Sequence, residues 1–272
     1  MSRFWSYFIA VPAGILLALS PVMHASAQTI PATRTPVLVE LFTSEGCSSC
    51  PPADALLMKL EQAQPVAGAE IIIMEEHVDY WEGQGWHDRF SSHQFTDRQN
   101  IYGTRFHIES VFTPQMVVDG TDQFVGNDAN KALKAIAQSA QTPKTSLLLS
   151  SISVDHGHVS GTVSMTGSSA GLPKGDLFAA LVDPQAETDV RGGENGGRQL
   201  HHAGVVRSLI KIGSIQDLAK GPVKFALAPP ANAAPGSEKV VVFAQRSGQG
   251  AVVAAVLGPV QSATLQPNVA SR

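Results

Sequence analysis

The feature that most constrains the fold is a pair of cysteines placed directly after a strand-like run. Cys47 and Cys50 are the only cysteines among 272 residues, and they follow the strand-like run 37–42. A bridge between residues three apart closes so small a loop that it removes little entropy from the unfolded chain. A framework of several disulfides would need more cysteines. The pair therefore indicates redox chemistry or metal binding rather than structural crosslinking.

The amino-terminal segment 1–27 has the order of a cleaved secretory signal. Arg3 is followed by an apolar stretch over 4–19 and then by the small residues 25–27. The alternative is a membrane anchor, but the apolar stretch contains Pro12 and falls short of the roughly 20 residues that span a bilayer. We therefore expect a signal peptide, a periplasmic or secreted protein, and no stable membrane insertion.

The charge of the chain argues against nucleic acid as a partner. There are 19 Lys and Arg against 23 Asp and Glu, and removal of residues 1–27 would take away only Arg3, which leaves a net charge of −5. No basic stripe offsets this mild acidity. Export would place the cysteine pair in an oxidising compartment, where it can rest as a disulfide bond.

The mature chain is long enough for two ordinary domains. After a tether at 28–36, residues 37–142 alternate strand, turn, helix and strand, which begins a βαβ unit with a parallel sheet. Strands are predicted at 37–42, 71–74, 115–118 and 123–126, helices at 53–63 and 129–139, and an inserted helical segment between 79 and 107, centred on 90–102.

The second region, residues 143–262, has the pattern of an all-β domain. Short strands are expected at 146–154, 158–165, 176–182, 205–212, 223–227, 239–245 and 251–257. Strands of this spacing, separated by Gly, Pro, Ser and Asp, indicate an antiparallel sandwich-like domain. Residues 263–272 are expected to form a flexible tail.

The first region resembles the thioredoxin-like superfamily. The resemblance rests on a strand, a Cys-x-x-Cys pair at the start of a helix, a second strand, and Phe112-Thr113-Pro114 before a later hairpin. It implies an α/β thioredoxin-like domain in which Pro114 is cis and lies against the cysteines, with Thr113 beside it for substrate binding. Pro51 and Pro52 depart from the usual pattern, so the helix is expected to start near Cys50 or Pro51.

A closer resemblance extends over both regions. The motifs ELFTSEGCSSCPPAD at 40–54, HVDYW at 77–81, TPQMVV at 113–118 and GEN at 193–195 are similar to those of an exported bacterial family catalogued as domain of unknown function 1223. This family implies a scaffold and no established reaction.

The first functional hypothesis is an exported thiol-disulfide oxidoreductase that acts on protein or small-molecule thiols and disulfides. Cys47 would be the exposed attacking thiol and Cys50 the resolving one of a redox-active centre. Tyr80 and Trp81, with Trp86, could form an apolar lip that receives an extended peptide. No bound cofactor is expected, and a membrane redox partner that recharges the pair is a further candidate partner.

The second hypothesis is a non-enzymatic protein, either a copper or zinc carrier or a protein-binding module. Cys47, Cys50 and His77 would supply the metal ligands. The histidines His77, His87, His93 and His107 match no compact ligand spacing, so solvated or hydrogen-bonded histidines are the simpler interpretation. His201 and His202 should point to opposite faces of a strand, which argues against a shared site.

Two further features are potential parts of the site. Glu45, Glu75, Glu76 or Asp79 could supply a carboxylate that moves protons for Cys50. The glycine-rich loop 192–198 lacks the strand-to-helix context of a phosphate cradle. Our hypothesis is that this loop folds over the Cys47 region at the junction of the two domains.

Overall fold

The computed structural model describes residue 1 and residues 34–155, 158–228 and 238–260. The expected signal peptide after Met1, the tether up to residue 33 and the expected tail therefore lie outside the described residues. Within the described ranges, no helix combines the length and the apolar character needed to cross a membrane.

The first half of the chain follows the predicted order of strands and helices. Its elements are β1 (Thr35–Thr43), α1 (Pro51–Ala63), β2 (Ala69–His77), α2 (His93–Arg105), β3 (Gln115–Val118), β4 (Asp122–Val125) and α3 (Ala129–Ser139). β1 pairs with β2 in parallel and with β3 in antiparallel orientation. The first two residues of β1 thus belong to a strand rather than to the expected tether.

Local chemistry explains where the helices begin. α1 starts with Pro51 and Pro52, which are tolerated in a first helical turn because its N–H groups have no partner within the helix. α3 begins after Asp128, whose carboxylate accepts a hydrogen bond from the Lys131 N–H at 3.0 Å. The inserted helix is α2, with its amino end at His93, after the Ser92 cap.

The second half of the chain is mostly strand. Its elements are β5 (Ser146–Asp155), β6 (His158–Thr166), β7 (Gly175–Asp189), β8 (Gln199–Ser214), the short α4 (Ile215–Leu218), β9 (Val223–Leu227), β10 (Lys239–Arg246) and β11 (Val252–Pro259). β5, β6 and β9 form a separate three-stranded sheet. The others join the strands of the first half.

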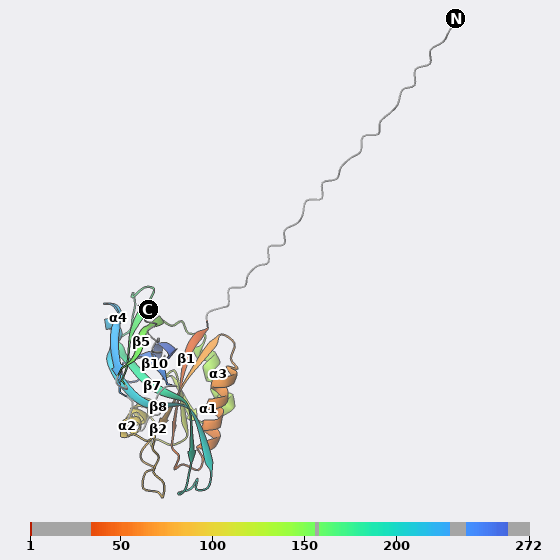
Figure 1. Ribbon diagram of the computed structural model, residues 1–272, viewed down its shortest axis with the longest axis vertical. Coiled ribbons are helices and arrows are strands. Elements are labelled where there is room, and N and C mark those ends of the chain that lie inside the picture. The colour runs from red at the N-terminus through yellow and green to blue at the C-terminus, as the bar shows by residue number, and fades with distance from the viewer. Residues whose placement is uncertain (2–33, 156–157, 229–237, 261–272) are drawn as a thin grey trace, which may run out of the picture. The chain divides into compact units, whose positions relative to one another are not determined.

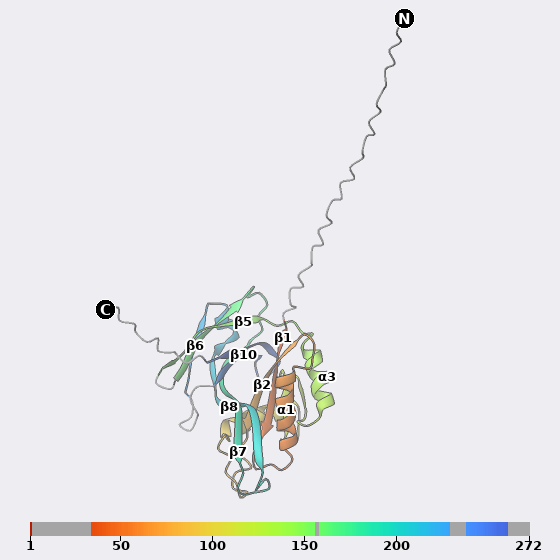
Figure 2. The same ribbon diagram turned by 45° about the vertical axis from the view of Figure 1, so that its right-hand side comes forward.

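One sheet runs through both expected domains. Its order is β11-β10-β7-β8-β2-β1-β3-β4, and the link between the halves is the parallel pairing of Glu75 on β2 with Val205 on β8. The expected boundary at residue 142 is therefore not a boundary of this sheet, and the β-rich half is not a self-contained sandwich. Figures 1 and 2 show β2 and β8 side by side at this junction.

The two faces of β1 enter different cores because side chains alternate along a strand. Val37, Val39 and Leu41 pack with α1 and α3, which Figure 2 shows together on one side of the sheet. Leu38 and Phe42 pack with α2 and with buried residues of β7, β8, β10 and β11. The second core explains why the halves form one body.

β7 and β8 are much longer than the strands predicted at 176–182 and 205–212. They pair from Asp176 opposite Ser214 to Asp189 opposite Gln199. The loop 190–198 lies at the end of this long hairpin, and Gly193 comes close to Gly85 in the segment after β2. The hairpin therefore brings residues of the second half to the cysteine segment.

Candidate functional site: the cysteine turn and the histidine cluster

The cysteines lie in a tight turn between β1 and α1. Cys47 and Cys50 form a disulfide bond with their Cα atoms 5.4 Å apart. The Cys47 N–H donates to the Ser44 carbonyl at 3.1 Å, and the Cys50 N–H donates to the Cys47 carbonyl at 3.2 Å. Cys50 is the N-cap residue of α1, as expected from the prolines that follow it.

Both cysteines are buried, and this corrects the expectation that Cys47 is exposed. Each has an exposed fraction of 0%, whereas Ser48 and Ser49 between them are exposed. Segments distant in sequence contact the turn that carries the cysteines.

The loop 192–198 is one of these segments, which confirms its predicted place over Cys47. The side-chain amide of Asn195 donates hydrogen bonds to the Glu45 carbonyl at 2.9 Å and to the Cys47 carbonyl at 3.0 Å. The Ser48 N–H donates to the Glu194 carboxylate at 3.3 Å. Asn195 is itself fully buried, so the loop is attached by a specific, desolvated contact.

The residues predicted to bind substrate lie on another side of the same turn. The Trp81 indole N–H donates to the Thr113 hydroxyl at 2.8 Å, and the Trp81 Cβ lies close to Gly46. Tyr80 is 38% exposed, with its ring 6.4 Å from that of Trp81. The peptide bond before the buried Pro114 is cis, as the resemblance implies.

Two buried histidines lie in a cluster beside the turn. His77 at the end of β2 and His202 on β8 have ring centroids 4.8 Å apart. Glu75 points to the same face of β2 as His77, because the two are separated by one residue. Its Oε1 is 2.7 Å from His202 Nδ1 and 3.5 Å from His77 Nε2. We call Glu75, His77 and His202 the histidine cluster.

Two acidic residues outside the cluster contact its imidazole rings. Asp88 Oδ2 is 2.7 Å from His77 Nδ1, and Glu45 Oε1 is 3.7 Å from His202 Nε2. The other Glu45 oxygen accepts a hydrogen bond from the Trp86 indole at 2.7 Å. Trp86 thus orients a carboxylate instead of contributing only to an apolar lip.

The charges in the cluster shift one another's protonation. Burial acts to lower the pKa of His77, but the Asp88 carboxylate outweighs it and raises the pKa to about 9. Burial likewise opposes the charged form of His202, yet Glu75 holds its pKa well above the usual value. Burial acts to raise the pKa of Glu75, and His202 brings it down to about 2. These groups form one strongly interacting unit.

Comparison with known proteins shows the family of this chain. A family model described as "Protein of unknown function (DUF1223)" matches residues 38–245. The chain belongs to this family. No curated protein sequence matches it.

Solved structures give two similarities. A crystal structure of a structural-genomics target from Agrobacterium tumefaciens is 26% identical, with a TM-score of 0.60 over 83% of this chain and 94% of that chain. A domain of the outer membrane lipoprotein Omp28 from Porphyromonas gingivalis is 15% identical, with a TM-score of 0.26 over 44% of this chain and 97% of that chain. The range matched by the DUF1223 model contains both the cysteine turn and the histidine cluster.

The other predicted histidines do not join the cluster. His87 and His93 are 82% and 74% exposed, and His107 is also exposed. His201 faces outward beside the buried His202, as the strand alternation predicts. His77 is a hydrogen-bonded histidine, as the simpler interpretation allowed: its Nδ1 lies 2.7 Å from Asp88 Oδ2, and its Nε2 lies 3.5 Å from Glu75 Oε1.

The four carboxylates proposed to move protons for Cys50 lie at three different sites. Glu45 and Glu75 belong to the surroundings of the histidines, and Asp79 bonds to Thr96 and His93 near the surface. Glu76 lies on the other face of the sheet, 3.5 Å from the buried Arg98. Among the described residues, none of these carboxylates forms a hydrogen bond with Cys50.

Asp54 is a buried carboxylate that the sequence prediction did not select. It lies four residues after Cys50, so one helical turn brings both to the same face of α1. It accepts a hydrogen bond from the Thr43 hydroxyl at 2.7 Å. Burial and the charge of Glu75 raise its pKa to about 7. Its helical spacing from Cys50 was the signal that could have found it.

A cavity of about 310 Å³ opens beside this turn of α1. It is lined by Pro51, Asp54, Ala55 and Met58 of α1 and by Gln199, Leu200 and His201 of β8. The cavity therefore lies between Pro51, next to Cys50, and the first residues of β8, which follow the loop 192–198.

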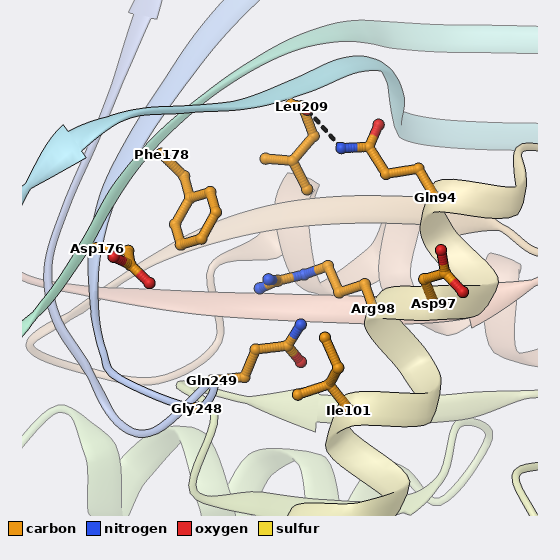
Figure 3. Close-up of a pocket in the computed structure, with 9 residues that line it drawn as sticks. All are labelled: Gln94, Asp97, Arg98, Ile101, Asp176, Phe178, Leu209, Gly248 and Gln249. Carbon is orange, nitrogen blue, oxygen red and sulfur yellow. Dashed lines mark hydrogen bonds between the residues drawn. The ribbon is translucent and has the colours of Figure 1, made fainter.

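A second cavity, of about 330 Å³, lies between α2 and the sheet. Figure 3 shows Arg98 extending from α2 into this space, between Phe178 and Gln249. Arg98 is only 4% exposed, and its guanidinium is bound by Glu40 at 2.5 Å. The charge of Arg98 is thus already paired with a carboxylate of the protein. The residues that line this cavity include no cysteine or histidine.

Proposed function

We propose that this DUF1223 protein is an exported, thioredoxin-like thiol-disulfide oxidoreductase that acts on protein or small-molecule thiols. The observation that carries the proposal is the Cys47–Cys50 disulfide at the amino end of α1, closed over by the Asn195 loop. A buried disulfide with a specific cover suits controlled exchange. The order β1, α1, β2, with the β3–β4 hairpin and α3 after it, supports the thioredoxin-like scaffold.

The reaction is a sequence of two thiolate attacks. A partner thiolate attacks Cys47 Sγ, the Cys47–Cys50 bond breaks, and Cys50 leaves as a thiolate that takes up a proton. A second partner thiolate then attacks the partner sulfur of the mixed disulfide and releases Cys47. The partner loses two electrons and becomes a disulfide, and the cysteine pair gains them as two thiols. The reverse sequence reduces a partner disulfide.

The covering loop controls access in this scheme. Both sulfurs are buried, so exchange requires the Asn195 contacts to open. Trp81 and Thr113 flank the turn on the side of Gly46, where an extended partner segment would lie. The cavity beside Pro51 provides room next to Cys50.

A redox titration followed by thiol alkylation and mass spectrometry tests the function. We expect a single two-electron transition between disulfide and dithiol. A Cys50→Ser variant should trap partners as mixed disulfides through Cys47, because no resolving thiol remains. The matched Cys47→Ser variant should trap none under the same conditions. A disulfide that never interconverts, or equal trapping by both variants, would contradict the proposal and favour a binding module.

A further inference from the structure

Three ligand-type atoms inside the protein lack the partners that buried polar atoms normally have. His77 Nε2, His202 Nε2 and Glu45 Oε1 are buried, and none has a hydrogen-bond partner among the described residues. Leaving one buried polar group unsatisfied typically costs about 1–3 kcal/mol. Their nearest opposite charges are farther away than a good hydrogen bond, with His202 Nε2 3.7 Å from Glu45 Oε1 and His77 Nε2 3.5 Å from Glu75 Oε1. Contacts of this length leave these atoms available to an ion.

The arrangement around the two imidazoles matches that of metal-binding histidines. A metal-bound histidine commonly uses one ring nitrogen for the metal and holds its other N–H against a carboxylate. Here the Nδ1 atoms of His77 and His202 lie 2.7 Å from Asp88 and 2.7 Å from Glu75. The Nε2 atoms are the ones without a hydrogen bond among the described residues.

The spacing of the side chains also fits an ion. Glu75, His77 and His202 each offer a ligand atom, and these atoms lie within 4.8 Å of one another. Ligand atoms around a tetrahedral zinc ion with bonds of about 2.0–2.1 Å are about 3.4 Å apart. The separation of 3.7 Å between His202 Nε2 and Glu45 Oε1 is close to this value. Both oxygens of Glu75 already accept hydrogen bonds, one from His202 Nδ1 and one from the Ala203 N–H.

We propose that His77 and His202 bind a divalent transition-metal ion through their Nε2 atoms, with Glu45 as a further ligand and Glu75 as the carboxylate that orients His202. Two imidazoles and carboxylate oxygens suit Zn²⁺ or a metal of similar preference, whereas Mg²⁺ and Ca²⁺ favour oxygen ligands alone. The site uses no cysteine and is therefore different from one made by Cys47, Cys50 and His77. The proposed metal ligands are also available when Cys47 and Cys50 form the disulfide bond.

Zn²⁺ and Co²⁺ titrations of the oxidised full chain, after treatment with a chelator, test this proposal. The readouts are isothermal titration calorimetry for Zn²⁺ and the visible absorption of bound Co²⁺. We expect one ion per chain. His202→Gln should weaken binding at least about 100-fold, since even the outer partners of a ligand are worth about 10- to 100-fold. His201→Gln, the exposed neighbour, is the matched control and should bind like the original chain.

Two further measurements keep the test decisive. If His202→Gln does not fold, Glu45→Gln replaces it, and the melting temperature of the unaltered chain should still rise with added Zn²⁺. A Cys47→Ser, Cys50→Ser double variant should retain the ion. Absence of binding to the unaltered chain, equal binding by His202→Gln, or loss of the ion only in the cysteine variant would overturn the proposal. These readouts need no redox activity, so they can fail independently of the oxidoreductase.

Discussion

The contact between Asn195 and the cysteine turn gives the most direct prediction. Asn195→Ala removes hydrogen bonds to the carbonyls of Glu45 and Cys47, at 2.9 and 3.0 Å. A neutral hydrogen bond contributes about 1 kcal/mol to stability, so the closed loop should lose about 2 kcal/mol relative to the open one. This corresponds to about a 30-fold larger open population.

Reduction of the disulfide should report this change. If dithiothreitol reaches the sulfurs only in the open state, its rate of reduction is proportional to the open population, because reclosing is faster than attack. We therefore expect Asn195→Ala to be reduced about 30-fold faster. The assay quenches samples with an alkylating reagent and counts labelled cysteines by mass spectrometry at several dithiothreitol concentrations.

Two variants separate the cover from general destabilisation. Asn195→Asp keeps the size of the side chain but cannot donate to the carbonyls, so it should be reduced at least as fast as Asn195→Ala. Asp189→Asn alters an exposed residue just outside the loop, at the end of β7, and should be reduced at the original rate. A rate for Asn195→Ala within about threefold of the original, less than about 0.7 kcal/mol, would refute the idea that this contact limits access.

Two other predictions concern stability. Gly204 has a φ of +68°, and a Cβ there would meet Ile73 at 2.8 Å, whereas Gly197 has a φ of +83° and open space. Gly204→Ala should therefore lower the free energy of unfolding by about 1–3 kcal/mol more than Gly197→Ala, because of overpacking. Urea unfolding measures this difference, and equal losses would contradict it. The hydrogen bond from Lys220 is the largest cause that holds the pKa of Asp217 well below its ordinary value of 3.8. The ionised Asp217 therefore stabilises the fold above pH 3.8, and this stabilisation is lost as the pH falls through the pKa of the folded state. Asp217→Asn should thus lower the melting temperature at neutral pH, and a difference that fails to shrink on acidification would contradict the assignment.

The regular elements of the first half were largely predictable. The helix expected at 129–139 has these bounds, because its apolar positions and the Asp128 cap agree. α1 begins at Pro51, as the two prolines predict, two residues before the apolar pattern at 53–63. The outer part of the long hairpin was missed, since Pro184 and the polar residues along 183–189 hide the strand pattern. The exposure pattern of β7 alternates there, as expected for a ribbon in contact with solvent.

The cysteine pair was predictable, but the histidine cluster was not. Cys47 and Cys50 are three residues apart, and the strand before them and the helix after them can be read from the local sequence. Glu75 and His202 are separated by 127 residues, and they meet only because β8 pairs in parallel with β2. A search for compact ligand spacings cannot find such a pair, because the sheet and not the local sequence sets the distance.

Glu45 connects the two parts of the site, and this connection can be measured. Its backbone carbonyl accepts a hydrogen bond from Asn195, and its carboxylate faces His202 Nε2 at 3.7 Å. Residues that share a partner typically show coupling energies of about 0.5–3 kcal/mol. The unfolding free energies of the original chain, Asn195→Ala, His202→Gln and the double variant should therefore be non-additive. Losses that add within about 0.5 kcal/mol would mean that the loop and the histidine cluster act independently, even though one hairpin carries both the loop and His202.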